Sequence, residues 1–286
     1  MPFFQGACTA LVTPFLNGKV NFTMLEQLIH RQLEAGIHAL VLCGTTGESP
    51  TLSDKEKVQI FYHGKQCAPD AKIICGTGSN DTRHAIDLSQ AAEDAGADAL
   101  LVVSPYYNKA TAKGLIEHYR TIAASVHIPI ILYNVPSRTG VDIPVSVYQE
   151  LSNIPNIAGV KEASTDITKV AKIIAQCPDH FYVWSGNDDM TVPILSLGGM
   201  GVISVVSNVA PTEVQEMCLA ALSENYTIAA ALQRELSDLT NALFSEVNPI
   251  PVKAAMKLIG YDCGSCRPPL SEPSPDTIKK LTALLT

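Results

Sequence analysis

The feature that most constrains this chain is a repeated unit in which a short, almost continuously apolar run precedes a longer amphipathic segment. Eight such runs, rich in β-branched residues, occur before residue 206. Strands that lack polar alternation are typical of parallel sheets whose two faces are both buried. The predicted strands cover residues 7–12, 39–43, 72–75, 99–103, 128–133, 157–161, 182–184 and 201–205.

Helical periodicity fills the intervals between these runs. The segments AGIHALVL at 35–42 and AGADALLV at 95–102 repeat one order of helix end, glycine turn and buried strand. Eight such units predict an α/β fold, a TIM (β/α)8 barrel. A doubly wound open sheet is the alternative, because periodicity does not show closure. A capping-box pattern at residues 53–56 opens one helix, and the others cover residues 23–35, 81–95, 111–125, 144–151, 166–177, 188–197 and 211–222.

The pattern changes after Glu224, where no further strand is predicted. Helices are predicted over residues 226–244, 251–259 and 275–285, and the proline-rich stretch RPPLSEPSP separates the last two. We therefore expect a catalytic barrel over residues 1–224 and a C-terminal helical region over residues 225–286.

Charge and hydropathy exclude several classes of partner. The net charge is −8 and no cluster of Lys or Arg occurs, so neither nucleic acid nor a membrane surface is expected as a partner. No apolar run approaches the roughly 18 residues that span a bilayer. The first cationic side chain is Lys19, which argues against a secretory signal. A cytoplasmic protein is the expectation.

No motif indicates a metal or nucleotide site. The seven histidines show neither HxH nor HExxH spacing, and no GxSxG elbow occurs. The stretch GTGSND at 76–81 lacks the third glycine of a dinucleotide loop. Eight scattered cysteines are expected to be reduced. Cys263 and Cys266 form a lone CxxC, which is weak evidence for zinc and leaves their role open.

Polar residues gather where the predicted strands end. GTTGE (44–48) follows the second strand, SPYYN (104–108) the fourth, YNVPSRTG (133–140) includes the end of the fifth, and SGND (185–188) follows the seventh. The sixth strand ends at Lys161. The carboxyl ends of the strands of such a barrel form one rim, where catalytic residues cluster. Hydroxyl groups, Arg138 and Lys161 are therefore predicted to converge there.

Lys161 is the candidate nucleophile. A free lysine has a pKa of ~10.4, and an apolar setting disfavours the cation and exposes the lone pair of the amine. Such an amine can condense with a ketone to a Schiff base, and the iminium then promotes loss of a proton from the adjacent carbon. The alternative is that Lys161 only pairs with a carboxylate such as Glu162.

Five further residues suit this chemistry, and each also has a structural explanation. Tyr133 can shuttle protons or be a core tyrosine. Thr45 and Thr46, in a glycine-flanked turn, can bind a carboxylate or cap the turn. Arg138 can bind a second carboxylate or form a surface salt bridge. Tyr107 can join a hydroxyl chain with Thr45 and Tyr133, or pack at an interface.

The four motifs GTTGE, SPYYN, YNVPSRTG and GVKEAS, in this order and spacing, resemble those of the 4-hydroxy-tetrahydrodipicolinate (dihydrodipicolinate) synthase family of pyruvate-dependent class I aldolases. The resemblance covers nearly the whole chain, including the helical tail. It implies a TIM-barrel lyase of lysine and diaminopimelate biosynthesis that condenses pyruvate with L-aspartate 4-semialdehyde. It also implies a covalent Schiff base with no metal or other cofactor, and a homotetramer built as a dimer of dimers.

The resemblance assigns roles by position. Lys161 matches the Schiff-base lysine and Tyr133 the proton-transfer tyrosine. Thr45 and Tyr107 match the rest of a hydroxyl relay, in which the tyrosine reaches in from a partner subunit. The residues that match substrate contacts are Thr46, Ile203 and Gly186 near pyruvate, and Arg138 at the carboxylate of the semialdehyde.

A feedback site for lysine is matched only in part. Ser49, Asn80 and Tyr106 fit the site that many relatives use to bind lysine at a dimer interface. The sensitive pattern has histidines and a glutamate where this chain has Asp54, Lys57 and His84. Because a cationic ligand would lose an acidic partner and gain a cationic neighbour, we expect weak or absent inhibition by lysine.

Two alternatives remain open from the sequence. An N-acetylneuraminate lyase or a keto-sugar-acid aldolase of the same superfamily would share the lysine, the tyrosine and a similar turn. Arg138 within VPSRTG, together with Tyr107, favours the synthase. A non-catalytic ligand-binding barrel is the third reading, because a fold alone does not prove an activity.

Overall fold

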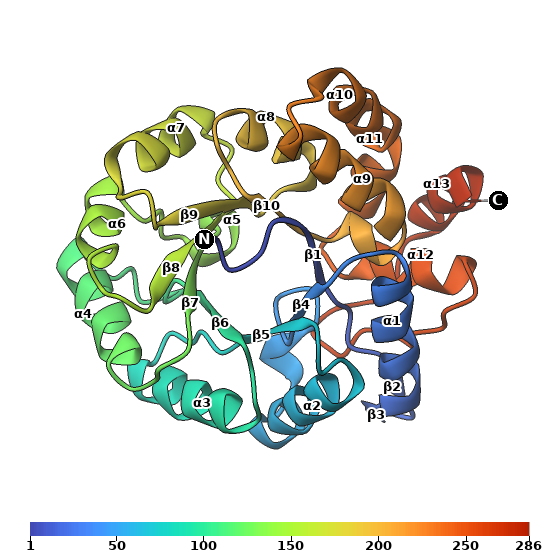
Figure 1. The fold of residues 1–286 in the computed structure, drawn as a ribbon. Helices are drawn as coiled ribbons and strands as arrows, with labels where there is room; N and C mark the ends of the chain where they lie inside the picture. Colours follow the sequence, from blue (N-terminus) through green and yellow to red (C-terminus); the bar gives the residue numbers. More distant parts are fainter. Residues whose placement is uncertain (286) are drawn as a thin grey trace.

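The eight predicted strands close into a parallel barrel in the computed structural model, which describes residues 1–285 (Figure 1). Neighbouring strands follow the order β1-β10-β9-β8-β7-β6-β5-β4. The predicted TIM barrel is therefore confirmed and the open sheet is excluded. The strands are β1 (Gly6–Ala10), β4 (Ala39–Leu42), β5 (Lys72–Gly76), β6 (Ala99–Val103), β7 (Ile130–Asn134), β8 (Ile157–Glu162), β9 (Tyr182–Ser185) and β10 (Gly201–Ser204). A small hairpin, β2 (Phe15–Leu16) and β3 (Lys19–Val20), was not predicted because two-residue strands leave no periodic pattern.

A ring of helices surrounds the barrel, as Figure 1 shows. The capping box is confirmed, since Ser53 accepts from the backbone of Glu56 and the Glu56 side chain accepts from the backbone of Ser53. The predicted helix over 188–197 is instead η2 (Asp188–Met190) followed by α8 (Thr191–Ser196). The other helices of the ring are α1 (Phe22–Glu34), α2 (Asp54–Cys67), α3 (Thr82–Asp94), α4 (Ala112–Ala123), α6 (Val145–Leu151), α7 (Ile167–Gln176) and α9 (Pro211–Leu222), and the short turns η1 (Ser49–Thr51), α5 (Pro136–Thr139) and η3 (Val206–Asn208) follow strand ends.

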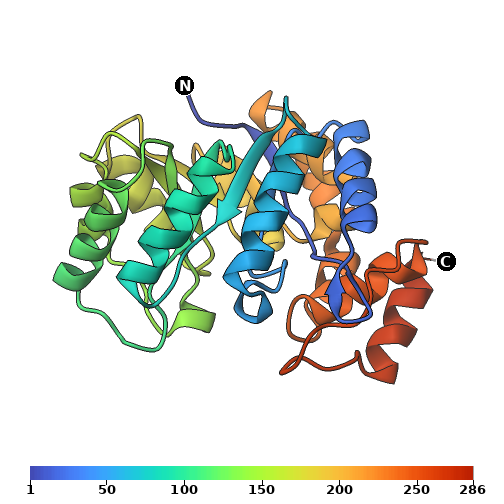
Figure 2. The ribbon, with the colours of Figure 1, turned by 90° about the horizontal axis from the view of Figure 1, so that it is seen from below.

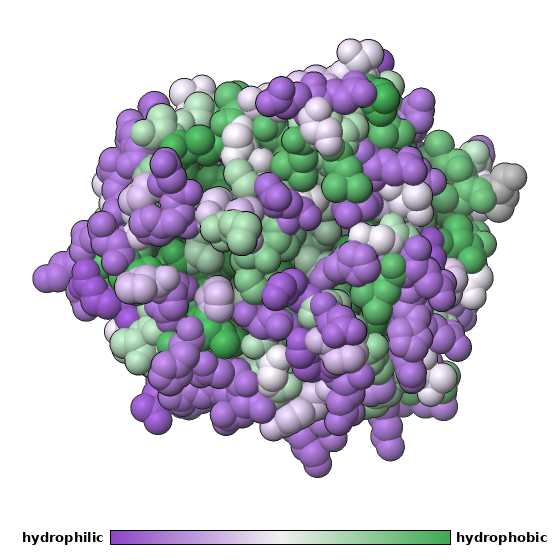
Figure 3. All heavy atoms as spheres, in the orientation of Figure 1, coloured by the Kyte–Doolittle hydropathy of each residue, from purple (hydrophilic) through white to green (hydrophobic). Residues whose placement is uncertain are grey.

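The C-terminal helices pack together at one side of the barrel. The predicted helix over 226–244 is divided at Leu236 into α10 (Tyr226–Glu235) and α11 (Ser237–Leu243). They are followed by α12 (Ile250–Leu258) and α13 (Pro275–Leu285), which pack against each other. Figure 2 shows this orange-to-red segment as a block beside the barrel. Figure 3 shows apolar residues at that edge and also over the centre of the same face, and α13 exposes Ile278 and Leu284.

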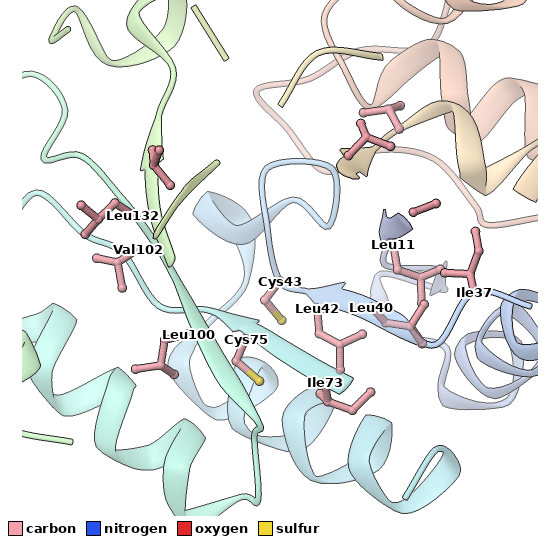
Figure 4. Packing of buried hydrophobic residues seen from close by; sticks show 14 of the residues in the cluster. Leu11, Ile37, Leu40, Leu42, Cys43, Ile73, Cys75, Leu100, Val102 and Leu132 are labelled. Carbon is pink, nitrogen blue, oxygen red and sulfur yellow. The ribbon is translucent and has the colours of Figure 1, made fainter. Parts of the chain in front are cut away.

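The barrel strands bury both of their faces, as their apolar sequences predict. Leu40, Leu42 and Ile73 belong to a cluster that lies between the strands and the helices (Figure 4). Val41, which lies between Leu40 and Leu42, and Ile74, which follows Ile73, belong to a second cluster inside the barrel. Side chains of a strand alternate between faces, so position along a strand decides whether a polar residue enters the barrel or meets the helices. Among residues 1–285, no helix is long and apolar enough to cross a membrane.

We predict that His118 makes the fold sensitive to acid. His118 on α4 is 5% exposed, its Nδ1 lies 2.9 Å from Thr82 Oγ1, and burial lowers its pKa from 6.5 to about 4. The unfolded chain therefore binds a proton that the folded chain does not bind between these two pH values. The contribution of His118 to the free energy of unfolding is unchanged above pH 6.5 and falls by about 3 kcal/mol as the pH drops to 4.

Urea unfolding at pH 7.5 and pH 4 measures this loss. His118→Gln keeps an acceptor for Thr82 but does not titrate, so the variant should lose about 3 kcal/mol less than the wild type between the two pH values. His30→Gln, at an exposed position on α1, is the matched control and should behave as the wild type does. Equal acid losses in all three proteins would contradict the prediction.

Candidate active site

Lys161 points into the barrel. Val160 lies in the outer cluster, so the alternation of β8 turns Lys161 inward, and its side chain is almost fully buried. Strand pairing places it opposite Tyr133 of β7, and Lys161 Nζ lies 4.5 Å from the centroid of the Tyr133 ring. Within residues 1–285, no carboxylate oxygen lies within 4 Å of this ammonium group. A salt bridge to Glu162 is therefore not the role of Lys161.

Glu162 points the opposite way, into the layer between strands and helices. Its Oε1 accepts from Asn134 Nδ2 and from the backbone N–H of Ser164, each at 2.8 Å. Its Oε2 accepts from the Tyr148 hydroxyl at 3.1 Å and lies 3.6 Å from Lys169 Nζ. Burial raises the pKa of Tyr148, and the charge of Glu162 raises it further. The cation nearest to this acid is therefore a different lysine, Lys169 on α7, which also pairs with Asp142 Oδ1 at closer range.

Asp188 is a second buried carboxylate near the strand ends. It accepts from the backbone N–H groups of Val205 at 3.0 Å and Val206 at 3.4 Å, and from the Ser204 hydroxyl. Burial raises its pKa, while these hydrogen bonds and the charge of Lys161 oppose that rise. Its hydrogen bonds tie the turn after β9 to the end of β10.

Gly186 lies close to the lysine, and Ile203 lies inside the barrel. A Cβ atom on Gly186 would lie 3.1 Å from Lys161 Cε and 2.6 Å from the Ala163 Cβ. The absence of a side chain at Gly186 therefore leaves the space that the lysine stem fills. Ile203 is fully buried in the inner cluster, which also contains Tyr133.

A cavity of about 290 Å³ opens at the ends of β4 and β7. Thr45, Tyr133 and Arg138 line it, and so do Ser49 and Tyr106, two residues predicted for the regulatory site. Predicted catalytic and regulatory residues thus share one hollow. The lining also includes Lys57 of α2.

Tyr107 is not brought to this cavity. It is 87% exposed, has a positive φ of 70° and does not line the hollow. Within residues 1–285, no hydrogen bond joins Thr45, Tyr107 and Tyr133 to one another. The hydroxyl relay expected from the resemblance is therefore not assembled within a single chain.

The GTTGE turn is held by the C-terminal region. Thr46 is 2% exposed, and its Oγ1 accepts from Asn248 Nδ2 at 3.0 Å. The buried carboxylate of Glu48 lies 2.8 Å from Lys253 Nζ and accepts from the backbone N–H of Arg267 at 2.8 Å. No sequence pattern predicted a role for Glu48, Asn248 or Lys253. Only the place of Glu48 within GTTGE could have indicated it.

The residues that replace the lysine-sensitive pattern pair with one another. His84 Nε2 lies 3.0 Å from both Asp54 carboxylate oxygens, and Lys57 Nζ lies 3.8 Å from Asp54 Oδ1. His84 Nδ1 also lies 3.2 Å from Ser79 Oγ. Asn80 does not line the cavity; its carbonyl accepts from the Asn108 side chain at 2.7 Å.

One group of side chains in the described part of the chain has metal-ligand types. Glu26, His63 and Cys67, on α1 and α2, hold ligand atoms within 4.8 Å of one another. His63 Nε2 already lies 3.1 Å from the Phe22 carbonyl oxygen and 3.4 Å from Cys67 Sγ. The group contains none of the predicted site residues. Cys263 and Cys266 are free thiols, and the first is buried.

Comparison with known proteins agrees with this arrangement. The profile of the dihydrodipicolinate synthetase family matches residues 3–286. The chain belongs to the dihydrodipicolinate synthetase family. A 4-hydroxy-tetrahydrodipicolinate synthase of Thermoanaerobacter sp. is 48% identical, with all of this chain and 97% of the relative aligned.

Solved structures of dihydrodipicolinate synthases share the fold closely. The crystal structure from Aquifex aeolicus superposes with a TM-score of 0.97 at 43% identity, over 99% of this chain and 97% of the other. A structure from Cyanidioschyzon merolae with lysine bound has a TM-score of 0.97 at 37% identity, over 100% and 98% of the two chains. The closed barrel and the C-terminal helices are therefore features of the dihydrodipicolinate synthetase family.

We predict that Lys169 stabilises the site by pairing with both Glu162 and Asp142. Lys169→Met leaves the buried Glu162 carboxylate with hydrogen bonds but without its cation. Breaking a buried ion pair from one side costs about 3–5 kcal/mol, and urea unfolding at pH 7.5 should show a loss of this order.

Lys172→Met is the matched control, because Lys172 is an exposed lysine on the same helix. It should change the free energy of unfolding by less than about 0.5 kcal/mol. Adding Glu162→Gln to Lys169→Met removes the uncompensated charge and should recover part of the loss. Equal stabilities of the two single variants would contradict the prediction.

Proposed function

We propose that this protein is a lyase that condenses pyruvate with L-aspartate 4-semialdehyde to form 4-hydroxy-tetrahydrodipicolinate, in lysine and diaminopimelate biosynthesis. The observation that carries the proposal is Lys161, which is buried in the barrel beside the Tyr133 ring and has no carboxylate of residues 1–285 within 4 Å. Membership of the dihydrodipicolinate synthetase family, and the names of the relatives, support the choice of substrates.

Lys161 acts as the nucleophile. Its neutral amine attacks the ketone carbon of pyruvate, and loss of water gives an iminium ion on Nζ. The iminium draws electrons from the neighbouring methyl group, which loses a proton to give an enamine. The enamine carbon then attacks the aldehyde carbon of the semialdehyde. This Schiff base takes the place of any separate cofactor.

Tyr133 moves protons in these steps. Addition of the amine and departure of water each need a proton delivered or removed near Lys161, and the phenol is the polar group whose ring lies against Nζ. Within the described residues, the Tyr133 hydroxyl has no hydrogen-bond partner. It is therefore available to Thr45, which lines the same cavity, and to substrate.

The substrate carboxylates have separate binding groups in this proposal. Thr46 and the backbone of its turn bind the carboxylate of pyruvate, and Ile203 and Gly186 shape the pocket around it. Arg138, exposed at the cavity rim, binds the carboxylate of the semialdehyde through its planar fork. The carboxylates of the two substrates are thereby bound by different strand-end turns.

Tyr107 completes the hydroxyl relay from a partner subunit. The Tyr107 side chain is highly exposed and extends away from its own chain. Its backbone has a positive φ, which is unusual for a residue that is not glycine. The proposal therefore includes a homotetramer built as a dimer of dimers, in which each cavity receives a tyrosine from its neighbour.

The proposed chemistry predicts a covalent adduct on Lys161. Incubation with pyruvate and borohydride should reduce the imine and increase the mass of the peptide that contains Lys161. Lys161→Ala should give no adduct and no condensation. Tyr133→Phe should still form the adduct, with a rate lowered by about 10²–10⁴-fold. Lys169→Arg, which keeps a cation at the neighbouring buried lysine, serves as control and should be trapped at Lys161.

A wild type that gives no adduct, or an adduct at another lysine, would refute the Schiff-base proposal. If the protein condensed pyruvate with an acylated sugar and not with the semialdehyde, the result would support the activity of the sugar lyases of the superfamily.

Weak or absent inhibition by lysine is the second prediction. Asp54 is already paired with His84 and Lys57, and Lys57 is one of the residues that line the hollow together with Ser49 and Tyr106. A second ammonium would be repelled there. Lys57→Gln removes the charge and should increase sensitivity to lysine, while Lys55→Gln, an exposed neighbour, should not. Strong, cooperative inhibition of the wild type at low lysine concentration would contradict the prediction.

A further inference from the structure

Asn248 makes a buried contact with the turn that the proposed function assigns to pyruvate. The residue precedes α12 in the C-terminal region and is 6% exposed. Its Nδ2 donates to Thr46 Oγ1 at 3.0 Å, across 202 positions of sequence. Its Oδ1 is buried and has no hydrogen-bond partner in the described chain. The contact with Thr46 is thus the side-chain hydrogen bond that sets which way the amide faces.

The direction of this hydrogen bond decides what the threonine can do. A hydroxyl group has one proton to donate and two lone pairs that accept. Because Thr46 Oγ1 accepts from Asn248, its own proton remains available for another acceptor. Hydrogen bonds to a carboxylate are charge-assisted and stronger than those between neutral groups. A threonine held in this way is a prepared donor to a carboxylate.

Resting on the proposed function, we propose that Asn248 is a positioning residue for the 2-oxo acid: its amide turns the Thr46 hydroxyl so that the proton points to the carboxylate of the keto acid bound on Lys161. The reactive ketone and the carboxylate are adjacent in pyruvate, so a carboxylate fixed by Thr46 also fixes the carbon that the amine attacks. Asn248 therefore acts through Thr46 and not on the substrate.

A second contact from the same region holds the other end of the turn. The Glu48 side chain is fully buried between Lys253 Nζ and the backbone N–H of Arg267. Glu48 has a positive φ of 57°, a conformation that costs free energy for a residue with a side chain. Lys253 and Arg267 also lie on the Phe15 ring, at 4.4 and 4.2 Å from its centroid. The C-terminal region therefore fixes the turn at Thr46 and at Glu48.

Two substitutions with opposite hydrogen-bonding character test the orientation. Asn248→Ala removes the donor and should raise the KM for pyruvate about tenfold, as expected for loss of one oriented, charge-assisted hydrogen bond. Asn248→Asp accepts the Thr46 proton and adds a negative charge beside the substrate carboxylate, so its KM for pyruvate should rise further. In both variants, kcat and the KM for the semialdehyde should stay within about threefold of wild type.

Controls separate orientation from packing. Ser245→Ala, in the same segment, loses hydrogen bonds to Ala242 and Thr277 but none to the turn, and should leave the KM for pyruvate unchanged. In a Thr46→Val background, Asn248→Ala should produce no additional rise, because no hydroxyl remains to be turned. Melting temperatures show which variants remain folded.

Three results would overturn the inference. One is an unchanged KM for pyruvate in both Asn248 variants. Another is an equal rise for Ala and Asp that extends to the semialdehyde and accompanies a lower melting temperature, which is the behaviour of a packing residue. The third is a full additional rise in the Thr46→Val background. In each of these cases, borohydride trapping at Lys161 in the wild type would still support the proposed function. A wild type that cannot be trapped would contradict both the proposed function and the role of Asn248.

Discussion

The cluster in which Lys169 pairs with Glu162 and Asp142 is the interaction on which the end of β8 depends. Consecutive residues of β8 face opposite sides, so a strand that delivers Lys161 to the barrel interior must send Glu162 into the helix layer. There the carboxylate would be costly without a partner. Lys169 of α7, with Asn134 and Tyr148, removes that cost. In the described part of the chain, the amine inside the barrel has no carboxylate within 4 Å, because the acid beside it points to the helix layer.

Contacts on both faces of β8 also fix its register against β7. Asn134 bonds Glu162 from the outer face while Tyr133 meets Lys161 on the inner face. The pair of strand ends is therefore joined on both of its sides, once by polar contacts and once by the stacking of an ammonium group on a ring. A rigid strand end of this kind holds an amine in one place more reliably than a loop does.

The sequence predicted the parts of this protein that depend on local pattern. Apolar runs without alternation indicated all eight barrel strands, and the strand-end motifs located Lys161, Tyr133, Thr45 and Arg138. The helix over 226–244 was wrong in one respect, since the chain turns at Leu236 with no glycine or proline to mark it. Asn248 and Lys169 were not predicted, because each contacts its partner, Thr46 or Glu162, only in the folded structure. Periodicity along the sequence does not indicate such contacts. Tyr107 stays a prediction, since its role requires a second chain.

The two contacts from the C-terminal region have a consequence for the timing of synthesis. Every strand of the barrel leaves the ribosome before Asn248, Lys253 and Arg267 do. Until these residues emerge, the turn at Thr46 and Glu48 lacks its contacts with the C-terminal region. The hold on this turn thus arrives only with the last segment to be translated, so a prematurely terminated chain would lack the contacts that Asn248, Lys253 and Arg267 make with Thr46 and Glu48.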